Sequence, residues 1–352
     1  MTQDKNPVKL SIVILCWNSQ KVLPDCLESL FSRTVPFPFE VIVADNDSSD
    51  DTVAFTRKNY PKAIVVQNGG NLGFSAGNNG GFRVARGEYV FILNPDTIIH
   101  EGTLEKLIQF ADAHPEAGAF GCQVVNPDGS PQQSARPFPT PLRCWLSALY
   151  LRPLGYLSSL FTCDTYLKWD GRTEREIDWT SGCSLLVRGE ILKRVGGFDE
   201  QFFYHFDEVD LCRRIWNLGC SILYTPEPVL THLGGNKPGI LPLSLEIEKN
   251  RNRYRYFFKH FGIQGASSVR RALLVSTLIR YLGYGVVALG GFRKGLQPRI
   301  KIYRGMWHWN RRLNLKAFFV DGTEPAGVSP LKNSDSKKGC DTDHQVTKRR
   351  VS

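Results

Sequence analysis

Apolar runs alternate with helical spacings over the first hundred residues of the chain. The apolar runs predict buried strands, and most of them end in polar or acidic turns. Between them, Val22–Thr34 carries apolar residues at helical spacing, and Asn71–Gly87 is a glycine- and asparagine-rich turn that leads into a helix. The strand segments are Val8–Ser19, Phe39–Thr52, Ala63–Asn68 and Tyr89–Asp96. This alternation predicts the α/β class, with a doubly wound and mostly parallel sheet.

The pattern changes after Thr103. A helix is predicted for Leu104–His114, followed by a strand, whereas residues 131–175 are rich in proline and aromatic residues and show no clear period. A strand then leads into a helix over 178–192, and the segment 206–220 predicts a helix with acids in its first turn. A strand and a loop follow over 221–235. From Asp321 onward the chain is polar, which predicts a disordered tail over 321–352.

Polar side chains follow three of the predicted strands where each strand ends. In a parallel sheet these ends share one edge, where open α/β sheets bind ligands. They are Asn18 with Ser19, Asp45 with Asp47, and Asp96. Asp96 has two interpretations, because Asn-Pro-Asp is also an ordinary turn. An acidic, glycine-lined edge suits a phosphate that brings Mg²⁺ or Mn²⁺, while the GxGxxG and GxxxxGK[ST] motifs of dinucleotide and P-loop sites are absent.

The net charge of +10 is unevenly distributed. Residues 249–320 contain sixteen Lys and Arg and no acid, so the rest of the chain carries 10 − 16 = −6. Such a basic block favours a polyanionic partner, either nucleic acid or anionic lipid. Within it, 272–292 is apolar with a single charge, Arg280. A central Arg makes spanning a membrane marginal, so a helix lying in the interface fits better than a spanning one. An ordinary core helix with a basic face is the alternative.

Cysteine usage and the N-terminus indicate the compartment. There are nine cysteines, an odd number, with no CxxC pair, which predicts reduced thiols in a cytosolic protein. The first residues lead directly into a strand, so no secretory signal is visible. We therefore expect a cytoplasmic protein that is peripheral on the inner face of the cell membrane.

Seven motifs occur in an order and spacing that resemble the family 2 inverting glycosyltransferases, closest to their rhamnosyltransferase-like branch. They are SIVILCWNS, VIVADNDSSDDT, NLGFSAGNNGGF, FILNPD, DWTSGCSLLVR, GGFDEQFFYHFDEVDLCRR and HLGG. The resemblance covers about residues 8–262. It implies a GT-A fold with a Rossmann-like sheet, a nucleotide-sugar-binding half (8–100), an acceptor-binding and catalytic half (101–240), and a basic helical extension (241–320) that associates with membranes.

The resemblance also implies roles for particular residues. Asp96 occupies the last position of the DxD motif and would hold a divalent metal together with His232, whereas Asn94 replaces the first acid. Asp207 and Glu208 occupy the catalytic-base position in swapped order, and position favours Glu208. The remaining implied contacts are Asn18, Asp45, Asn71, Gly73 and Asn94 with the nucleotide sugar, and Trp179 with the acceptor.

The implied activity is transfer of a sugar to a hydroxyl of a lipid-linked or growing surface glycan. L-rhamnose from dTDP-L-rhamnose is the expected donor, and another UDP- or GDP-linked sugar is the alternative. The acceptor would be linked to a polyprenyl diphosphate. Two other classes stay open, a nucleic-acid-binding protein and a non-catalytic scaffold of a glycan assembly complex; the acidic sheet edge speaks against nucleic acid, and the oligomeric state is not indicated.

Overall fold

The computed structural model describes residues 7–158, 161, 163–234, 241–289 and 293–320. Contacts divide the chain into two compact units, residues 1–238 with 252–273, and residues 239–251 with 274–352. The first unit contains the sheet and every candidate site residue. The boundaries predicted at residues 100, 240 and 320 remain predictions, and the predicted tail 321–352 lies outside the described residues.

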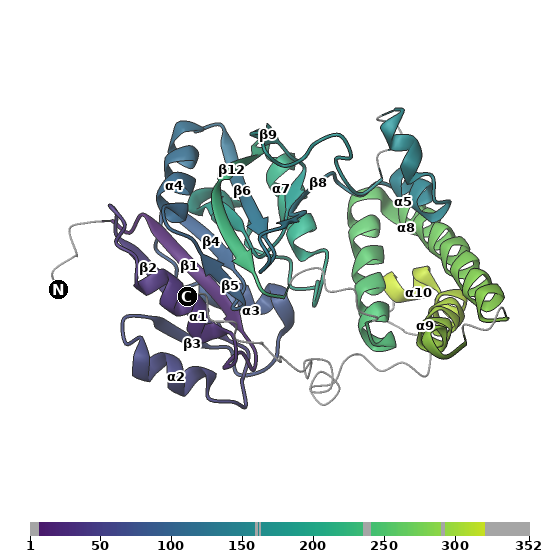
Figure 1. Ribbon diagram of the computed structural model, residues 1–352, viewed down its shortest axis with the longest axis horizontal. Coiled ribbons are helices and arrows are strands. Elements are labelled where there is room, and N and C mark those ends of the chain that lie inside the picture. The colour runs from purple at the N-terminus through teal and green to yellow at the C-terminus, as the bar shows by residue number, and fades with distance from the viewer. Residues whose placement is uncertain (1–6, 159–160, 162, 235–240, 290–292, 321–352) are drawn as a thin grey trace. The chain divides into compact units, whose positions relative to one another are not determined.

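The first unit is built on one twisted sheet with helices on both faces (Figure 1). Its sheet strands are β1 (Leu10–Cys16), β2 (Phe39–Asp45), β3 (Ile64–Gln67), β4 (Tyr89–Leu93), β5 (Thr97–Ile99), β6 (Ala117–Val125), β7 (Pro131–Gln132), β9 (Arg175–Glu176), β11 (Leu185–Arg188) and β12 (Ser221–His232), and β8 (Ala135–Arg136) pairs separately with β10 (Trp179–Thr180). Its helices are α1 (Leu23–Phe31), α2 (Thr52–Asn59), α3 (Gly73–Phe82), α4 (Thr103–Ala113), α5 (Pro141–Ala148), the 3₁₀ turn η1 (Arg152–Tyr156), α6 (Gly189–Val195) and α7 (Asp207–Asn217).

The strand order is β3-β2-β1-β4-β11-β6-β12-β5. The strands β3, β2, β1 and β4 are parallel, as predicted, and β6 is parallel to β12. Strand β11 is antiparallel to both of its neighbours and joins the two parallel groups. The predicted α/β class with a mostly parallel central sheet is confirmed. The parallel register brings Cys16 level with Asp45, so the polar strand ends lie along one edge.

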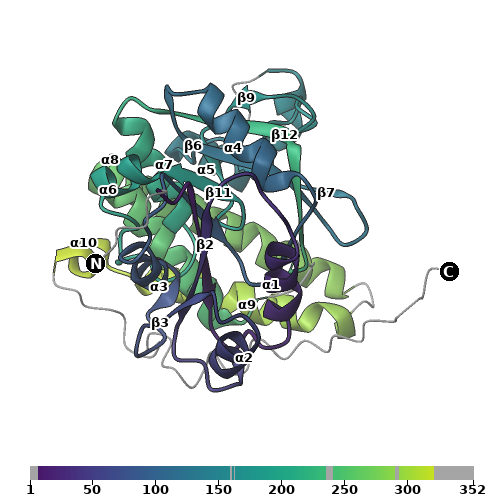
Figure 2. The ribbon, with the colours of Figure 1, turned by 90° about the vertical axis from the view of Figure 1, so that its left-hand side faces the viewer.

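The two faces of β1 meet different helices, because side chains alternate along a strand. Ile12 and Ile14 pack into the core that α1 and α4 cover. On the other face, a Cβ added at Gly81 of α3 would lie 2.5 Å from Val13, and one at Gly77 would lie 2.5 Å from a methyl group of Leu15. The glycines predicted to form a turn therefore lie within the helix and let it approach the sheet closely. Figure 2 shows α1 and α3 on opposite sides of the sheet.

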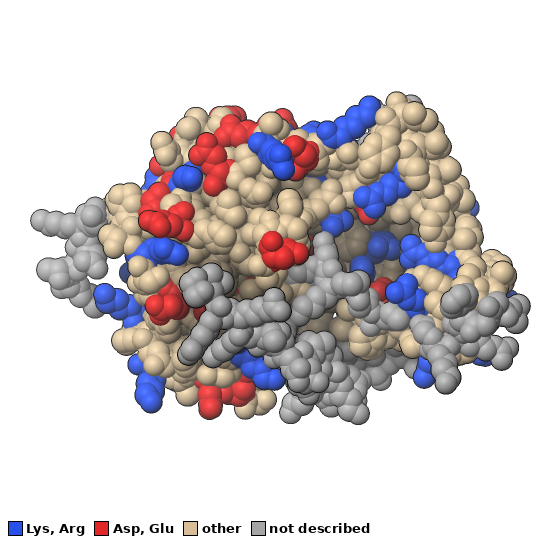
Figure 3. All heavy atoms as spheres, in the orientation of Figure 1, with Lys and Arg blue, Asp and Glu red and all other residues tan. Residues whose placement is uncertain are grey.

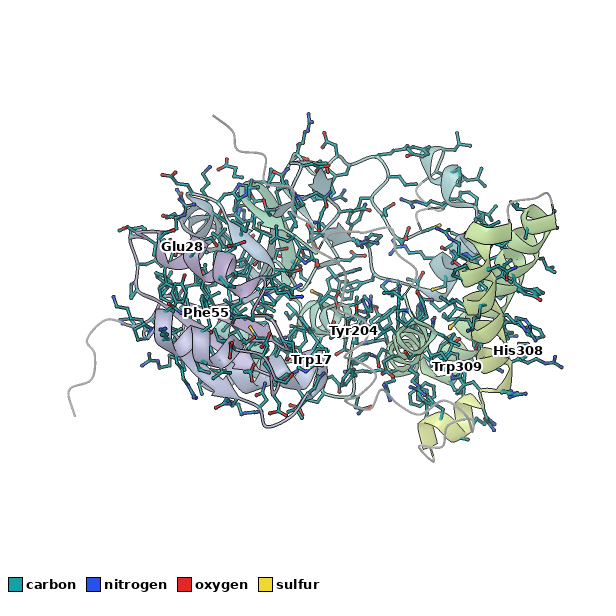
Figure 4. The ribbon with its side chains drawn as sticks, turned by 60° about the horizontal axis from the view of Figure 1, so that its bottom comes forward. Trp17, Glu28, Phe55, Tyr204, His308 and Trp309 are labelled. Carbon is teal, nitrogen blue, oxygen red and sulfur yellow. The ribbon has the colours of Figure 1, made fainter. Side chains whose placement is uncertain are left out.

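The C-terminal helices are α8 (Leu243–Leu289), α9 (Arg293–Arg312) and α10 (Leu315–Val320). Helix α8 is two helices separated by a kink at Gly262, where φ is 66°. Its residues 252–273 belong to the first unit. In the second unit Trp309 points inward and is buried, while His308 is exposed (Figure 4). By length and composition alone, one helix in the described ranges, Leu243–Ala288, could cross a membrane.

Candidate functional site

Hydrogen bonds join the segment after β1 and the end of β2 to the same turn, which contains Ser48 and Ser49. Asn18, at a left-handed φ of 50°, accepts a hydrogen bond from the Ser49 backbone N–H at 2.8 Å. Its own N–H donates to Ser48 Oγ at 2.8 Å. The carboxylate of Asp45 accepts from the Ser48 N–H at 3.0 Å. Asn18 and Asp45, predicted to lie at one edge, are therefore brought to the same turn.

Asp45 has spare hydrogen-bonding capacity. The residue is 1% exposed, and its Oδ1 has no hydrogen-bond partner within the described part of the chain. A buried acceptor left without a donor costs about 1–3 kcal/mol. A ligand that carries an N–H or O–H group to this oxygen would recover that cost.

Asn71 and Gly73 form a second turn beside this edge. The side-chain Oδ1 of Asn71 accepts from the Gly73 N–H at 3.2 Å, and the side chain of Asn46 donates to the Gly73 backbone carbonyl at 3.0 Å. Gly73 has a φ of 81°, and a Cβ there would lie 2.6 Å from the Phe203 side chain and from its carbonyl oxygen. Only glycine fits this position, because both the backbone angle and the space exclude a side chain.

Asp96, which precedes β5, and His232, the last residue of β12, lie 136 residues apart in sequence and meet because β5 pairs with β12. His232 Nε2 lies 3.3 Å from Asp96 Oδ1 and 3.4 Å from the side-chain nitrogen of Asn94. A Cβ at Gly234 would lie 2.3 Å from Asp96 Oδ2. The glycine of the HLGG motif therefore allows its backbone to lie close to the Asp96 carboxylate.

Sequence reasoning missed Gln132, which holds His232 from the other side. Its side-chain amide oxygen accepts from His232 Nδ1 at 3.1 Å, and its amide nitrogen donates to the His232 carbonyl oxygen at 2.9 Å. Gln132 lies in the stretch 131–175, where no periodicity is visible, and only the pairing of β7 with β6 brings it to this edge. No sequence signal marks it.

Asp96, His232 and Asn94 fit a divalent cation whose remaining coordination positions are filled by another ligand. Within the residues that the structure describes, no three His, Cys, Asp or Glu side chains form a metal cluster. Asp96 and His232 together supply one carboxylate and one imidazole, which are ligands that Mn²⁺ and Mg²⁺ accept in combination with phosphate oxygens. Asn94 adds an amide beside them. Two protein ligands leave the other coordination positions to a diphosphate.

The three acids in the first turn of α7 have different surroundings. Asp210 is fully buried and pairs with Arg214 at 2.7 Å, with Lys259 at 2.9 Å and with His260 at 2.8 Å. Burial raises the pKa of Asp210, but these three partners outweigh it and lower the pKa. Asp210 therefore serves as a structural counter-ion that joins α7 to α8.

Among the residues that the structure describes, no Lys, Arg or His forms such an ion pair with Asp207 or Glu208. Asp207 is 4% exposed and accepts from the Glu208 backbone N–H at 2.9 Å. Burial, followed by the neighbouring Glu208 carboxylate, raises the pKa of Asp207 well above its ordinary value. Glu208 Oε2 is buried and has no hydrogen-bond partner among the described residues. A carboxylate oxygen with open capacity is what a proton acceptor requires.

The residues just before this pair are held in an unusual conformation. His205 and Phe206 have φ values of 65° and 69°, in the left-handed region that non-glycine residues seldom adopt. The ring of the preceding Tyr204, labelled in Figure 4, packs at a tilt against the His205 ring with centroids 4.0 Å apart, and the Tyr204 carbonyl accepts from Asn252 of α8 at 2.7 Å. The surrounding structure thus fixes a strained turn, a feature that often accompanies functional sites.

The carboxylates of Asp96 and Glu208 both interact electrostatically with the buried thiol of Cys183. Burial raises the pKa of Cys183 to about 11, and the charges of both Asp96 and Glu208 contribute to the rise. A Cβ at the adjacent Gly182 would lie 3.9 Å from the Cβ of Glu208. The segment 181–184 between β10 and β11 therefore lies near both acids, and the antiparallel β11 positions it there.

Trp179, in β10, was predicted to contact the acceptor. Its indole N–H donates to the Pro137 carbonyl at 3.0 Å, and the Arg136 guanidinium lies 5.9 Å from its ring. The side chain is half-buried. Its assignment to the acceptor stays a prediction.

Comparison with known proteins finds similarity to glycosyltransferases. Residues 11–163 match the glycosyl transferase family 2. The chain is 29% identical over 292 residues, 77% of its length and 94% of the relative's, to an N-acetylglucosaminyl-diphospho-decaprenol L-rhamnosyltransferase of Mycobacterium tuberculosis. It is 26% identical to the rhamnosyltransferase WbbL of Escherichia coli, covering 61% of this chain and 80% of WbbL.

A solved structure shows the same fold. The mannosyltransferase PcManGT from Pyrobaculum calidifontis, in complex with GDP-Man and Mn²⁺, superposes with a TM-score of 0.50 at 16% identity. The match covers 87% of this chain and 88% of that one. The GT-A fold expected from the motifs is confirmed, and the match of residues 11–163 to glycosyl transferase family 2, together with the similarity to rhamnosyltransferases, supports the expected rhamnosyltransferase-like family.

Proposed function

We propose that the chain is a metal-dependent, inverting glycosyltransferase that moves L-rhamnose from dTDP-L-rhamnose to a hydroxyl of a lipid-linked surface glycan. The observations that carry the proposal are that the fold brings Asp96 to 3.3 Å from His232, and that it leaves a buried carboxylate oxygen of Glu208 without a hydrogen-bond partner among the described residues. The similarity to rhamnosyltransferases of Mycobacterium tuberculosis and Escherichia coli supports the choice of rhamnose.

On the donor side, Asp45 would receive the base. Its buried and unpartnered Oδ1 can accept the ring N3–H of thymine or uracil, a donor that cytosine lacks at that position. Asn71 and Gly73 would line the nucleotide, and Asn18 would hold the turn beneath it. The donor chemistry that the site favours is therefore a thymidine or uridine diphosphate.

Asp96 and His232 would hold a divalent cation, with Asn94 beside them. A cation bound there would offset the negative charge that develops on the leaving diphosphate. The Mn²⁺ found with PcManGT belongs to that protein and supports the same choice of metal here. The protein's own contribution is to keep one imidazole and one carboxylate 3.3 Å apart in a partly buried place.

On the acceptor side, Glu208 would act as general base. Its open oxygen would take the proton of the acceptor hydroxyl while that oxygen attacks the anomeric carbon from the face opposite the diphosphate, which inverts the configuration. Asp207, whose pKa is raised, would remain protonated beside it and would limit the repulsion between the two acids. Trp179 would line the acceptor.

Calorimetric titration with dTDP, UDP, GDP and dCDP, with and without Mn²⁺, tests the donor and metal assignments. We expect dTDP to bind in a Mn²⁺-dependent manner and dCDP to bind at least about tenfold more weakly, the effect of about 1.4 kcal/mol. Asp96→Ala should remove the metal dependence, whereas the exposed Asp25→Ala should not. Metal-independent binding of every nucleotide would contradict the metal assignment. Preferred binding of GDP would contradict rhamnose from dTDP-L-rhamnose.

The membrane partner is proposed from the second unit. Helix α8 exposes an apolar stripe, and most of these side chains recur at helical spacing. They are Leu278, Ile279, Leu282, Val286 and Val287, with Val286 the most exposed at 69%. On another side of the helix, Arg280 lies over Tyr303, which stacks on Tyr284 at 5.6 Å. Over α8 and α9 the charged atoms visible in Figure 3 are mainly basic, which suits the inner, anionic leaflet.

Vesicle flotation of the full chain tests this surface. Deletion from Lys249 would remove residues 252–273 from the sheet unit, so point substitutions are cleaner. Leu282→Glu with Val286→Glu should lower partition into phosphatidylglycerol-containing vesicles by about tenfold or more, because two apolar side chains leave the interface. Leu142→Glu, at a site 59% exposed in the first unit, is the matched control. Equal flotation of both variants would contradict the proposal.

A further inference from the structure

We propose that Gln132 is a positioning residue that sets the tautomer of His232 and so prepares His232 Nε2 for a cation. The proposal deepens the proposed function and rests on its assignment of Asp96 and His232 to a divalent metal. Gln132 ends the short edge strand β7, and its side chain reaches the last residue of β12.

The two hydrogen bonds of Gln132 fix the orientation of its amide. The His232 carbonyl oxygen can only accept, so the NH₂ group of Gln132 must point to it, at 2.9 Å. The amide oxygen then faces His232 Nδ1 at 3.1 Å. Because this oxygen can only accept, Nδ1 must carry a hydrogen, and the neutral ring has its lone pair on Nε2.

The surroundings of Nε2 agree with this tautomer. The side-chain nitrogen of Asn94 lies 3.4 Å away and can donate to the lone pair. Asp96 Oδ1 lies 3.3 Å away and is itself an acceptor. Two acceptors that face each other at this distance repel unless a positive charge lies between them. The clamp by Gln132 therefore produces a pair of acceptors that a metal ion satisfies.

In the alternative, His232 is an imidazolium that donates its Nε2 proton directly to Asp96, and no metal ion lies between the two groups. In that arrangement Gln132 would only fasten β7 to β12. The two roles differ in what they predict for metal affinity, since outer partners of a metal-bound histidine change affinity by about 10–100-fold when they are removed.

The test measures Mn²⁺ affinity of the full chain by electron paramagnetic resonance, in the presence of dTDP. Gln132→Leu removes both hydrogen bonds and should weaken Mn²⁺ binding by about 10–100-fold. Gln132→Asn, one methylene shorter, should give a similar loss and serves if the leucine variant does not fold. Gln109→Leu, at an exposed position of α4, is the matched control and should bind as the unaltered chain does.

Two further measurements separate positioning from structure. In a His232→Asn background, Gln132→Leu should cause no additional loss, because its effect passes through the imidazole. Nitrogen NMR of ¹⁵N-histidine should find the proton on Nδ1 of His232 in the unaltered chain and redistributed in Gln132→Leu. Unchanged Mn²⁺ affinity in Gln132→Leu, an equal loss in the His232→Asn background, or a proton on Nε2 would overturn the proposal.

Failure of the proposed function is distinguishable from failure of this inference. If the unaltered chain binds no Mn²⁺ at all, the metal assignment fails, while the NMR measurement still decides whether Gln132 sets the tautomer. If the unaltered chain binds Mn²⁺ and Gln132→Leu binds it equally, the metal assignment stands and only the role of Gln132 is wrong.

Discussion

The first turn of α7 presents acids in two contrasting environments. Asp210 has three basic partners within 3 Å and is fully buried, so its charge is compensated. Glu208, two residues earlier, has a buried oxygen with no partner in the described part of the chain. The two residues have the same type of side chain and a similar relation to the helix N-terminus, where acids are favoured by about 0.3–1 kcal/mol.

The contrast distinguishes an acid that holds the fold from one that is available for chemistry. Helix α8 supplies Lys259 and His260 to Asp210, whereas the 181–184 segment supplies no cation to Glu208. The same contrast separates Asp210 from Asp45, whose Oδ1 is also buried and open. Asp45 and Glu208 therefore differ from Asp210 because each has a buried oxygen that can still accept a hydrogen bond.

The largest expected effect is on catalysis. Glu208→Gln should reduce kcat by about 10²–10⁴-fold, because an amide cannot accept the hydroxyl proton as a general base does. Nucleotide affinity and Tm should stay unchanged, since Glu208 makes no compensating ion pair. Steady-state transfer assays and calorimetry measure both. Glu190→Gln, an exposed acid in the first turn of α6, is the control, and loss of nucleotide binding in Glu208→Gln would show a structural role instead.

The second effect is on stability. Asp210→Asn should lower the free energy of unfolding by about 3–5 kcal/mol, because Arg214 and His260 would remain buried without a counter-charge. Denaturant titration measures the change. Asp199→Asn removes only the 2.6 Å contact with Lys259 at a more exposed place and should cost at most about 1 kcal/mol. Equal stability of the two variants would contradict the structural role assigned to Asp210.

The smallest effect is a change of pH dependence at Asp207. The pKa of Asp207 is raised in the folded state, so the folded chain keeps a proton that the unfolded chain loses above its ordinary pKa of 3.8. Its contribution to stability is therefore greatest at low pH and declines as the pH rises through the window between the two pKa values. Asp207→Asn should flatten this decline and raise Tm at neutral pH. The exposed Asp25→Asn is the control, and a steeper decline in Asp207→Asn would contradict the direction of the shift.

The alternation of strands and helices was readable from the sequence because its first half obeys local rules. Side-chain periods of 2 and 3.6 residues and polar strand ends predicted the parallel strands and the edge that carries Asp45 and Asp96. The sequence predicted a glycine-rich turn that leads into a helix over 71–87, but it could not tell that Gly77 and Gly81 pack against Leu15 and Val13, because that packing is a tertiary contact. Strand β11 was expected as a strand, but its antiparallel insertion was not.

The candidate site divides in the same way. The residue types and motif order were sufficient to name Asp96, His232 and Glu208, because the chemistry requires carboxylates and an imidazole and the motifs resemble a known family. The sequence could not tell that Asp210 is neutralised by α8 while Glu208 is not, nor that Gln132 clamps His232 across a hundred residues. Those facts depend on which groups approach one another and how much water remains around them, and these are properties of the folded chain, since burial and pairing arise only when distant segments pack together.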